Sequence, residues 1–135
     1  MNNDCVFCKI VKGEIPSYKI YEDDFTFAFL DLNNDANGHV LVIPKQHCIN
    51  ILDCDNSMLA HVMDTVKLVS KHLVEKCGFG GVNVLNASGK DAEQSVFHLH
   101  FHILPRKSDD VFSVWPKLPE NTKSQDEVLK LFKIN

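Results

Sequence analysis

The stretch "SVFHLHFHIL", residues 95 to 104, decides the fold expected for this chain of 135 residues. Apolar residues and histidines alternate along it, and in a strand the two sets point to opposite faces. The apolar set predicts a core face and consists of Leu99, Phe101 and Ile103. The histidines would share the other face, and they are His98, His100 and His102.

Four further strands are expected around this segment. "YKIYED" (18–23) and "FTFAFLD" (25–31) are rich in aromatic and β-branched residues and meet at an acidic corner, which predicts a β-hairpin. After the turn-rich "NNDANG" (33–38), "HVLVIP" (39–44) alternates and stops at a proline. "GVNVLNA" (81–87) is the last of the four, and the polar loop "SGKDAEQ" (88–94) joins it to the histidine segment.

One long helix and two short ones complete the prediction. Between Ser57 and Gly78 the apolar residues recur at steps of three and four, the period of an amphipathic helix: Leu59, Val62, Met63, Val66, Val69, Leu73 and Cys77. "DCVFCKIVKGEIP" (4–16) suits a short helix stopped by Gly13. "SQDEVLKLFK" (124–133) starts with the capping-box pattern of Ser124 and Glu127.

The element order predicts one α+β domain over residues 1–135. We expect a five-stranded, mainly antiparallel sheet packed on one long helix, with short helices at both ends.

Composition narrows the classes of partner and compartment. The 18 acidic and 14 basic residues give a net charge of −4 and are scattered, so no basic stripe exists for a polymeric nucleic acid. A single nucleotide stays possible. No apolar run approaches the roughly 20 residues that span a bilayer. Five cysteines, two of them as Cys5-x-x-Cys8, suit a reducing compartment, and we expect a cytoplasmic protein.

Three interpretations of the histidine face are open, and the first is a purely structural role. Isolated histidines are often structural, but three together repel one another when more than one is protonated, and sheet stability does not require them. A metal ion is the second reading, although the outer two lie roughly 13 Å apart on a regular strand at about 3.3 Å per residue. Nucleophilic attack by a neutral imidazole on a phosphorus centre is the third, with a neighbouring histidine stabilising the phosphoryl oxygens.

The sequence resembles the histidine triad (HIT) family of nucleotide hydrolases and transferases, in particular its small bacterial-type, Hint-like branch. The signature is "QSVFHLHFHILPR" (94–106), and "CxFCKIxxGEIP", "YEDD", "AFLDL", "GHVLVIPK" and the Asn86 loop occur in the expected order. The resemblance covers residues 4–106 and leaves 107–135 as a tail.

The resemblance implies roles for four histidines. His100 would attack the α-phosphorus and form a nucleotidyl-histidine intermediate, which water cleaves to release a nucleoside 5′-monophosphate. His102 would stabilise the phosphate charge, and His98 completes the triad. His39 in "GHVLVIP" matches a fourth family histidine beside the triad, although from the residues alone it reads as an ordinary strand histidine.

The resemblance also implies a nucleotide site. Asp31 would hold the ribose hydroxyls, and Asn86, Gln94 and Ser95 would lie at the phosphates, where they otherwise read as polar residues at strand ends. An apolar slot for the base would consist of Phe7, Ile10, Ile15, Phe29 and Leu32. Plain core packing is the alternative for this set.

Cys5 and Cys8 are half of a metal site or a redox pair. The redox reading is disfavoured because no strand of a thioredoxin-like βαβ unit precedes them. Some family members complete a Cys₂His₂ zinc site with residues that correspond to His47 and His98. Such a closed site would be structural, and it would leave His100 to attack.

The expected activity is therefore hydrolysis of nucleoside phosphoramidates or adenylated compounds. The alternatives are dinucleoside polyphosphate hydrolysis and a zinc-stabilised nucleotide-binding interaction protein with incidental turnover. Glu93 stands where the family commonly has glycine, which bears on the leaving group that the loop accepts. The family usually forms homodimers. The sequence does not fix the physiological substrate, the preferred base or the pathway.

Overall fold

The computed structural model describes residues 3–32 and 38–135, so most of the expected "NNDANG" turn lies outside the described residues. In the described part, one sheet of five strands has the order β1-β2-β3-β5-β4, and every neighbouring pair is antiparallel. The strands are β1 (Lys19–Glu22), β2 (Thr26–Leu30), β3 (Val40–Pro44), β4 (Gly81–Leu85) and β5 (Phe101–Arg106). The predicted α+β fold is confirmed.

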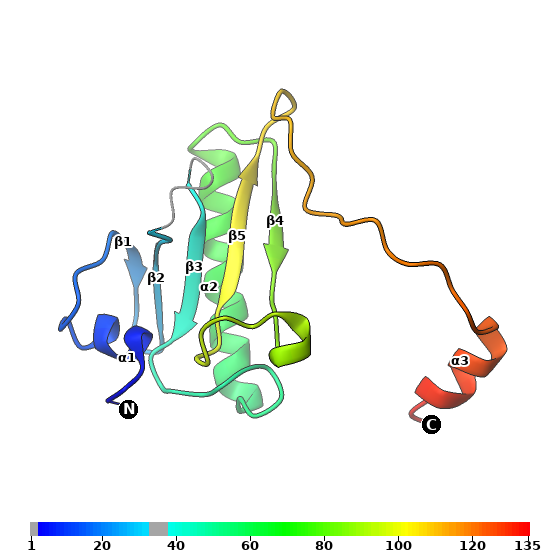
Figure 1. Ribbon diagram of the computed structural model, residues 1–135. Coiled ribbons are helices and arrows are strands. Elements are labelled where there is room, and N and C mark those ends of the chain that lie inside the picture. The colour runs from blue at the N-terminus through cyan, green and yellow to red at the C-terminus, as the bar shows by residue number, and fades with distance from the viewer. Residues whose placement is uncertain (1–2, 33–37) are drawn as a thin grey trace.

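Helix α2 (Asn56–Glu75) covers one face of the sheet (Figure 1). Its buried stripe includes Val62, Val66 and Val69, which pack with Leu99, Phe101 and Ile103 from the histidine segment. The helix ends at Glu75, before the predicted stop. Two members of the predicted apolar stripe, Met63 and Cys77, are exposed and contribute little to the core.

Helix α1 (Val6–Val11) packs on the opposite face, where its Phe7 and Ile10 join Phe29 and Leu41 in a second core cluster. The Cys5 side chain caps this helix by accepting the Cys8 N–H at 3.4 Å. β2 and β3 are buried over nearly their whole length because both of their faces are covered. The predicted short N-terminal helix is therefore present and holds both cysteines near the sheet.

The histidine segment differs from the prediction in one respect. β5 starts at Phe101, so residues 95–100 are not a strand as expected. Leu99 still packs in the core cluster on the α2 side, whereas the rings of His98 and His100 contact Phe7 of the other cluster. The register of β3 and β5 would place Leu99 opposite Pro44. Pro44 has no N–H, and its carbonyl oxygen takes the His98 Nε2–H instead, at 2.8 Å. The ladder therefore ends there, and His98 and His100 precede the strand.

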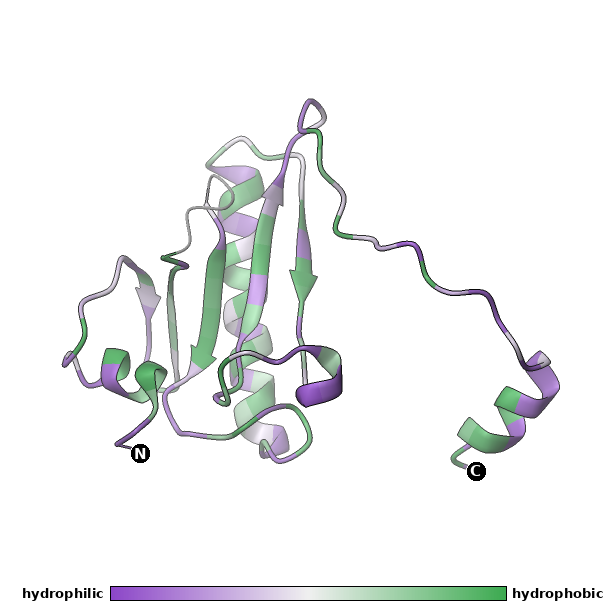
Figure 2. Ribbon diagram, viewed as in Figure 1, coloured by the Kyte–Doolittle hydropathy of each residue, from purple (hydrophilic) through white to green (hydrophobic). Residues whose placement is uncertain are grey.

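The chain from residue 107 onward leaves the body as an extended tail and ends in helix α3 (Gln125–Phe132) (Figure 1). Ser124 caps this helix as predicted, accepting the Glu127 N–H at 3.2 Å. No residue of α3 is buried. Figure 2 shows apolar residues along this isolated helix, and Leu129 and Phe132 are 60% and 72% exposed.

The start of the tail is anchored to the sheet. The Arg106 guanidinium donates to Asp110 at 2.6 and 2.8 Å and to Asn83 at 2.7 Å, and it lies over the Phe112 ring. Within the described residues, no helix is long and apolar enough to span a membrane.

Candidate active site and metal cluster

His98 lies at the centre of a cluster of two cysteines and two histidines. Its Nδ1 is 3.4 Å from Cys5 Sγ, 3.5 Å from Cys8 Sγ and 3.1 Å from His47 Nδ1. His47 Nδ1 is 3.4 Å from Cys8 Sγ, and the four ligand atoms all lie within 4.8 Å of one another. His98 and Cys8 are fully buried. The structure thus brings together the four residues expected to bind zinc.

The hydrogen bond of the His98 ring leaves one of its nitrogens available to a metal. The Pro44 carbonyl only accepts, so His98 carries its proton on Nε2 and presents the Nδ1 lone pair to the cluster. Burial lowers the pKa of His98 to about 4, which keeps the ring neutral, as a ligand must be. Tetrahedral zinc with Zn–N of about 2.0 Å and Zn–S of about 2.3 Å separates its ligand atoms by about 3.3 to 3.8 Å. The four separations of 3.1 to 3.5 Å given above agree with that range within 0.2 Å.

His100 is the histidine best placed to attack a ligand. Its Nδ1–H donates to the His98 carbonyl oxygen at 2.8 Å, which leaves the lone pair on Nε2. Burial lowers the pKa of His100 and favours the neutral, nucleophilic ring. The Asn86 amide donates to the carbonyl oxygen of His100 at 3.0 Å, and the edge of the Phe7 ring contacts the imidazole. Backbone and ring are therefore both held in place.

His102 belongs to a chain of polar groups on the other side of His100. Its Nδ1 is 2.7 Å from His39 Nε2, and His39 Nδ1 is 3.4 Å from Asp31 Oδ2. The rings of His100 and His102 lie 4.9 Å apart between centroids. A carboxylate, an imidazole and a second imidazole in sequence can stabilise a positive charge on His102 and pass a proton along their hydrogen bonds.

The loop before the triad is built around Gln94. The Gln94 amide donates to the carbonyl oxygens of Ile49 and Val96, and its oxygen accepts from Gly89 N–H and from Asn50. Both amide hydrogens are thus used inside the protein, and the expected contact of Gln94 with phosphate stays a prediction.

Ser95 is exposed beside Gln94, whereas Glu93 follows the short 3-10 helix η1 (Lys90–Ala92). Glu93 has a φ of +66°, a left-handed conformation that glycine adopts with less strain. The backbone thus gives a physical reason for glycine at this position, where the sequence has a charged residue.

The residues expected to form a base slot divide into two groups. Phe7, Ile10 and Phe29 are core residues, with exposed fractions of 2 to 6%. Ile15 is half-buried and Leu32 is 62% exposed. Ile10 and Ile15 also line an open depression of about 300 Å³ beside α1. Core packing accounts for the first group, and a role of these residues in base binding stays a prediction.

Sequence reasoning missed how the site histidines are held. The carbonyl oxygens of Pro44 and His98 orient the imidazoles of His98 and His100, and backbone partners leave no mark on residue type. The pairing of Asp31 with His39 did have a signal. Residues 25–31 and 39–44 were both predicted as strands with only a short turn between them, and the Asp31 N–H donates to the His39 carbonyl oxygen at the end of the β2–β3 ladder.

Comparison with known proteins assigns the family. Residues 12–109 match the HIT domain, and the chain belongs to the HIT family. The Zn-bound histidine triad family protein from Mycobacterium smegmatis is 36% identical, with a TM-score of 0.77 over 82% of this chain and 80% of that one.

Several relatives are named as enzymes, including one from yeast and one from Arabidopsis. Adenosine 5′-monophosphoramidase HNT1 of Saccharomyces cerevisiae is 40% identical over 78% of this chain and 64% of its own length. Adenylylsulfatase HINT3 of Arabidopsis thaliana is 43% identical over 82% of this chain and 56% of its own length. The chain therefore spans between about half and two thirds of the length of each of these two proteins.

Proposed function

We propose that the protein is a nucleotide hydrolase that cleaves nucleoside phosphoramidates or related adenylated compounds at the α-phosphate. The observation that carries the proposal is the hydrogen bond from His100 Nδ1 to the His98 carbonyl, which leaves Nε2 with its lone pair beside His102. The enzymatic names of the yeast and Arabidopsis relatives support the same reaction class.

The reaction proceeds in two steps. His100 Nε2 forms a bond to the α-phosphorus while the bond to the leaving amine or oxygen breaks, and the leaving group takes up a proton from His102 or water. Protonated His102 stabilises the charge on the phosphoryl oxygens, and His39 holds it in place. Water then attacks the phosphorus, the bond to His100 breaks, and a nucleoside 5′-monophosphate is released. No redox partner is required.

In this proposal, a zinc ion has a structural role. Cys5, Cys8, His47 and His98 would fill all four positions of a tetrahedral ion, which leaves none open for a substrate or a water. When bound, zinc would tie α1 to the histidine segment and fix the His98 carbonyl that orients His100.

Substrate comparison with a nucleophile variant tests the proposal. The purified chain should hydrolyse adenosine 5′-monophosphoramidate to AMP faster than it hydrolyses a diadenosine polyphosphate. The His100→Asn variant should lose turnover by about 10⁴-fold while AMP affinity changes little, because the nucleophile acts in the chemical step. Faster cleavage of the polyphosphate would favour the second hydrolase activity. Unchanged turnover in His100→Asn would remove the assigned nucleophile and leave a binding protein with incidental turnover.

We also propose a homodimer of single-domain chains in the cytoplasm, with residues 107–135 as the tail of the domain. β4 is an edge strand of the described sheet, and the apolar residues of α3 bury nothing within the described chain. Both features suit contact with a second copy. The five free cysteines suit a reducing compartment. Light scattering at micromolar concentration measures the oligomeric state, and a monomer would contradict the dimer.

A further inference from the structure

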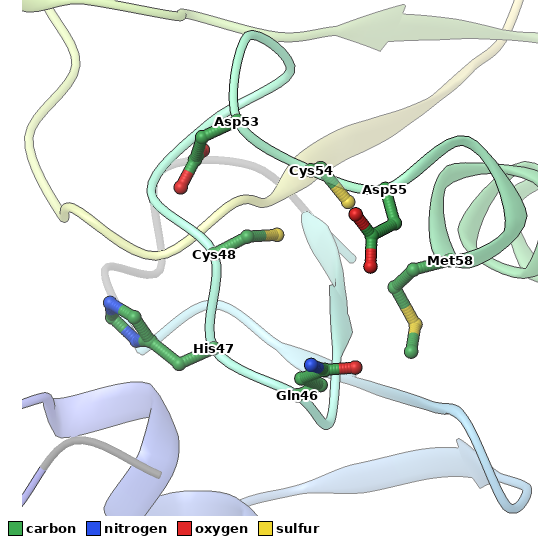
Figure 3. A pocket seen from close by; sticks show the side chains of 7 residues that line it. All are labelled: Gln46, His47, Cys48, Asp53, Cys54, Asp55 and Met58. Carbon is green, nitrogen blue, oxygen red and sulfur yellow. The ribbon is translucent and has the colours of Figure 1, made fainter.

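Cys48 and Cys54 form a second pair of thiols, outside the four-residue metal cluster. Both side chains are buried, with exposed fractions of 9% and 8%, and they belong to the same core cluster and line the same pocket. Figure 3 shows the two sulfurs directed into the space between their backbones, in a pocket that Asp53, Asp55 and Met58 also line. The catalytic and metal residues described above use neither thiol.

This pair lies where the site meets helix α2. Cys48 directly follows the metal-cluster residue His47, and its carbonyl oxygen accepts the Leu99 N–H at 2.8 Å, between His98 and His100. Cys54 directly precedes Asp55, the N-cap of α2. A covalent bond between the sulfurs would thus join the start of α2 to the segment that supports the triad.

We propose that Cys48 and Cys54 are a peroxide-sensitive dithiol whose oxidation to a disulfide reversibly lowers turnover. One thiol reacts with hydrogen peroxide to give a sulfenic acid and one water, and the second thiol displaces the hydroxyl group to give the disulfide and a second water. The sulfurs lose two electrons and two protons, and the peroxide oxygens are reduced. The effect on turnover rests on the proposed function, whereas disulfide formation does not.

The pocket favours a small, neutral oxidant. Its volume is about 80 Å³, which admits peroxide but not a peptide-sized disulfide such as oxidised glutathione. Asp53 and Asp55 at the same pocket repel anionic oxidants. Both thiols are almost fully buried, so the reaction is slow and requires sustained exposure.

The loss of turnover follows from the contacts of the loop. Drawing Cys48 toward Cys54 displaces the carbonyl oxygen that binds Leu99 N–H, and the adjoining His98 carbonyl holds the His100 ring. A shift of about 1 Å at a reacting group is enough to cost about 100-fold in rate. Reduction of the disulfide restores the contacts.

Peptide mapping and rate measurement on the full chain test the proposal. The reduced protein is exposed to hydrogen peroxide or, separately, to oxidised glutathione, and is then digested without reductant. We expect a Cys48–Cys54 linkage with peroxide only, a fall in turnover of at least about tenfold, and recovery with dithiothreitol. Cys48→Ala/Cys54→Ala should keep its turnover under peroxide, and so should the single Cys54→Ala chain. Cys77→Ala, which removes an exposed thiol, should respond as the unsubstituted protein does.

The outcomes separate this proposal from the proposed function. A linkage of Cys5 to Cys8 in place of Cys48 to Cys54, or no linkage at all, overturns the dithiol. Equal loss of turnover in the unsubstituted protein and in Cys48→Ala/Cys54→Ala overturns its control of the site. A linkage in a chain that never turned over a nucleotide would confirm the dithiol and contradict the hydrolase.

Discussion

His98 and His102 are two residues on either side of the proposed nucleophile, yet their surroundings differ in kind. His98 is fully buried against two sulfurs and a third histidine, and its Nε2–H is bound to a backbone carbonyl. His102 is half-buried and contacts an imidazole that in turn faces the Asp31 carboxylate. Burial keeps the His98 ring neutral, whereas His102 is hydrogen-bonded in a chain that ends at a carboxylate. The histidines of the triad therefore differ in role because their contacts differ, although their residue type is the same.

Substitution of a cysteine in the cluster around His98 is expected to have the largest effect. Cys8→Ser should lower zinc affinity by more than the roughly 10- to 100-fold that follows loss of a hydrogen-bond partner of a ligand, because it removes a ligand itself. The melting temperature should fall with it, since metal binding stabilises the fold. Zinc content by mass spectrometry and thermal unfolding measure both. Cys77→Ser is the matched control, and equal zinc content in the two variants would contradict the cluster.

Substitution of His102, which belongs to the hydrogen-bonded chain that ends at Asp31, should leave the metal in place. His102→Gln should lower kcat by about 10² to 10⁴-fold, the usual contribution of a positioned proton donor, with unchanged zinc content. Steady-state kinetics and metal analysis of one sample test this. Loss of zinc together with activity would contradict the separation between the metal cluster around His98 and the chain of His102, His39 and Asp31.

The role of Asp31 sharpens the comparison. A contact with the ribose, as the family resemblance implies, predicts that Asp31→Asn raises KM. A contact with His39 predicts a lower kcat, by roughly tenfold or more, because an amide at this position favours the wrong tautomer of the neighbouring imidazole. We expect the loss in kcat to dominate. A change confined to KM would assign Asp31 to the ribose alone.

The smallest effect is expected at the base of the tail. Arg106 lowers the pKa of Asp110 to about 2, so the ionised carboxylate stabilises the folded state above its unfolded pKa, and this contribution is lost as the pH falls toward 2. Asp110→Asn should lower the melting temperature slightly at pH 6, and the difference from the unsubstituted protein should shrink as the pH falls toward 2. Asp109→Asn is the control. An undiminished difference at pH 2 would contradict the assigned pair.

Most of the fold followed from side-chain patterns. Alternation placed Leu99, Phe101 and Ile103 in the core with the histidines opposite, and the spacing of Val62, Val66 and Val69 identified the long helix. The start of β5 did not follow, because alternation reports side-chain direction and not backbone pairing. Pro44 interrupts that pairing, and only the register of β3 against β5 reveals its position.

The sequence suggested candidate residues for the site but not the contacts among them. The structure brings Cys5, Cys8, His47 and His98 together, as the family resemblance implied. The internal bonds of Gln94 were not foreseen, because an amide in a polar loop suits a phosphate and a buried turn equally well. Neither was the Cys48–Cys54 pair, whose members are six positions apart in an irregular loop.

Locating the covalent intermediate tests the central claim most directly. The protein is mixed with adenosine 5′-monophosphoramidate, quenched within one turnover under mildly alkaline conditions that preserve phosphoramidate bonds, and digested for mass spectrometry. The account predicts an adenylyl group on His100 that disappears as AMP accumulates. An adduct on His102, or AMP formed in a single turnover with no adduct on any histidine, would contradict it.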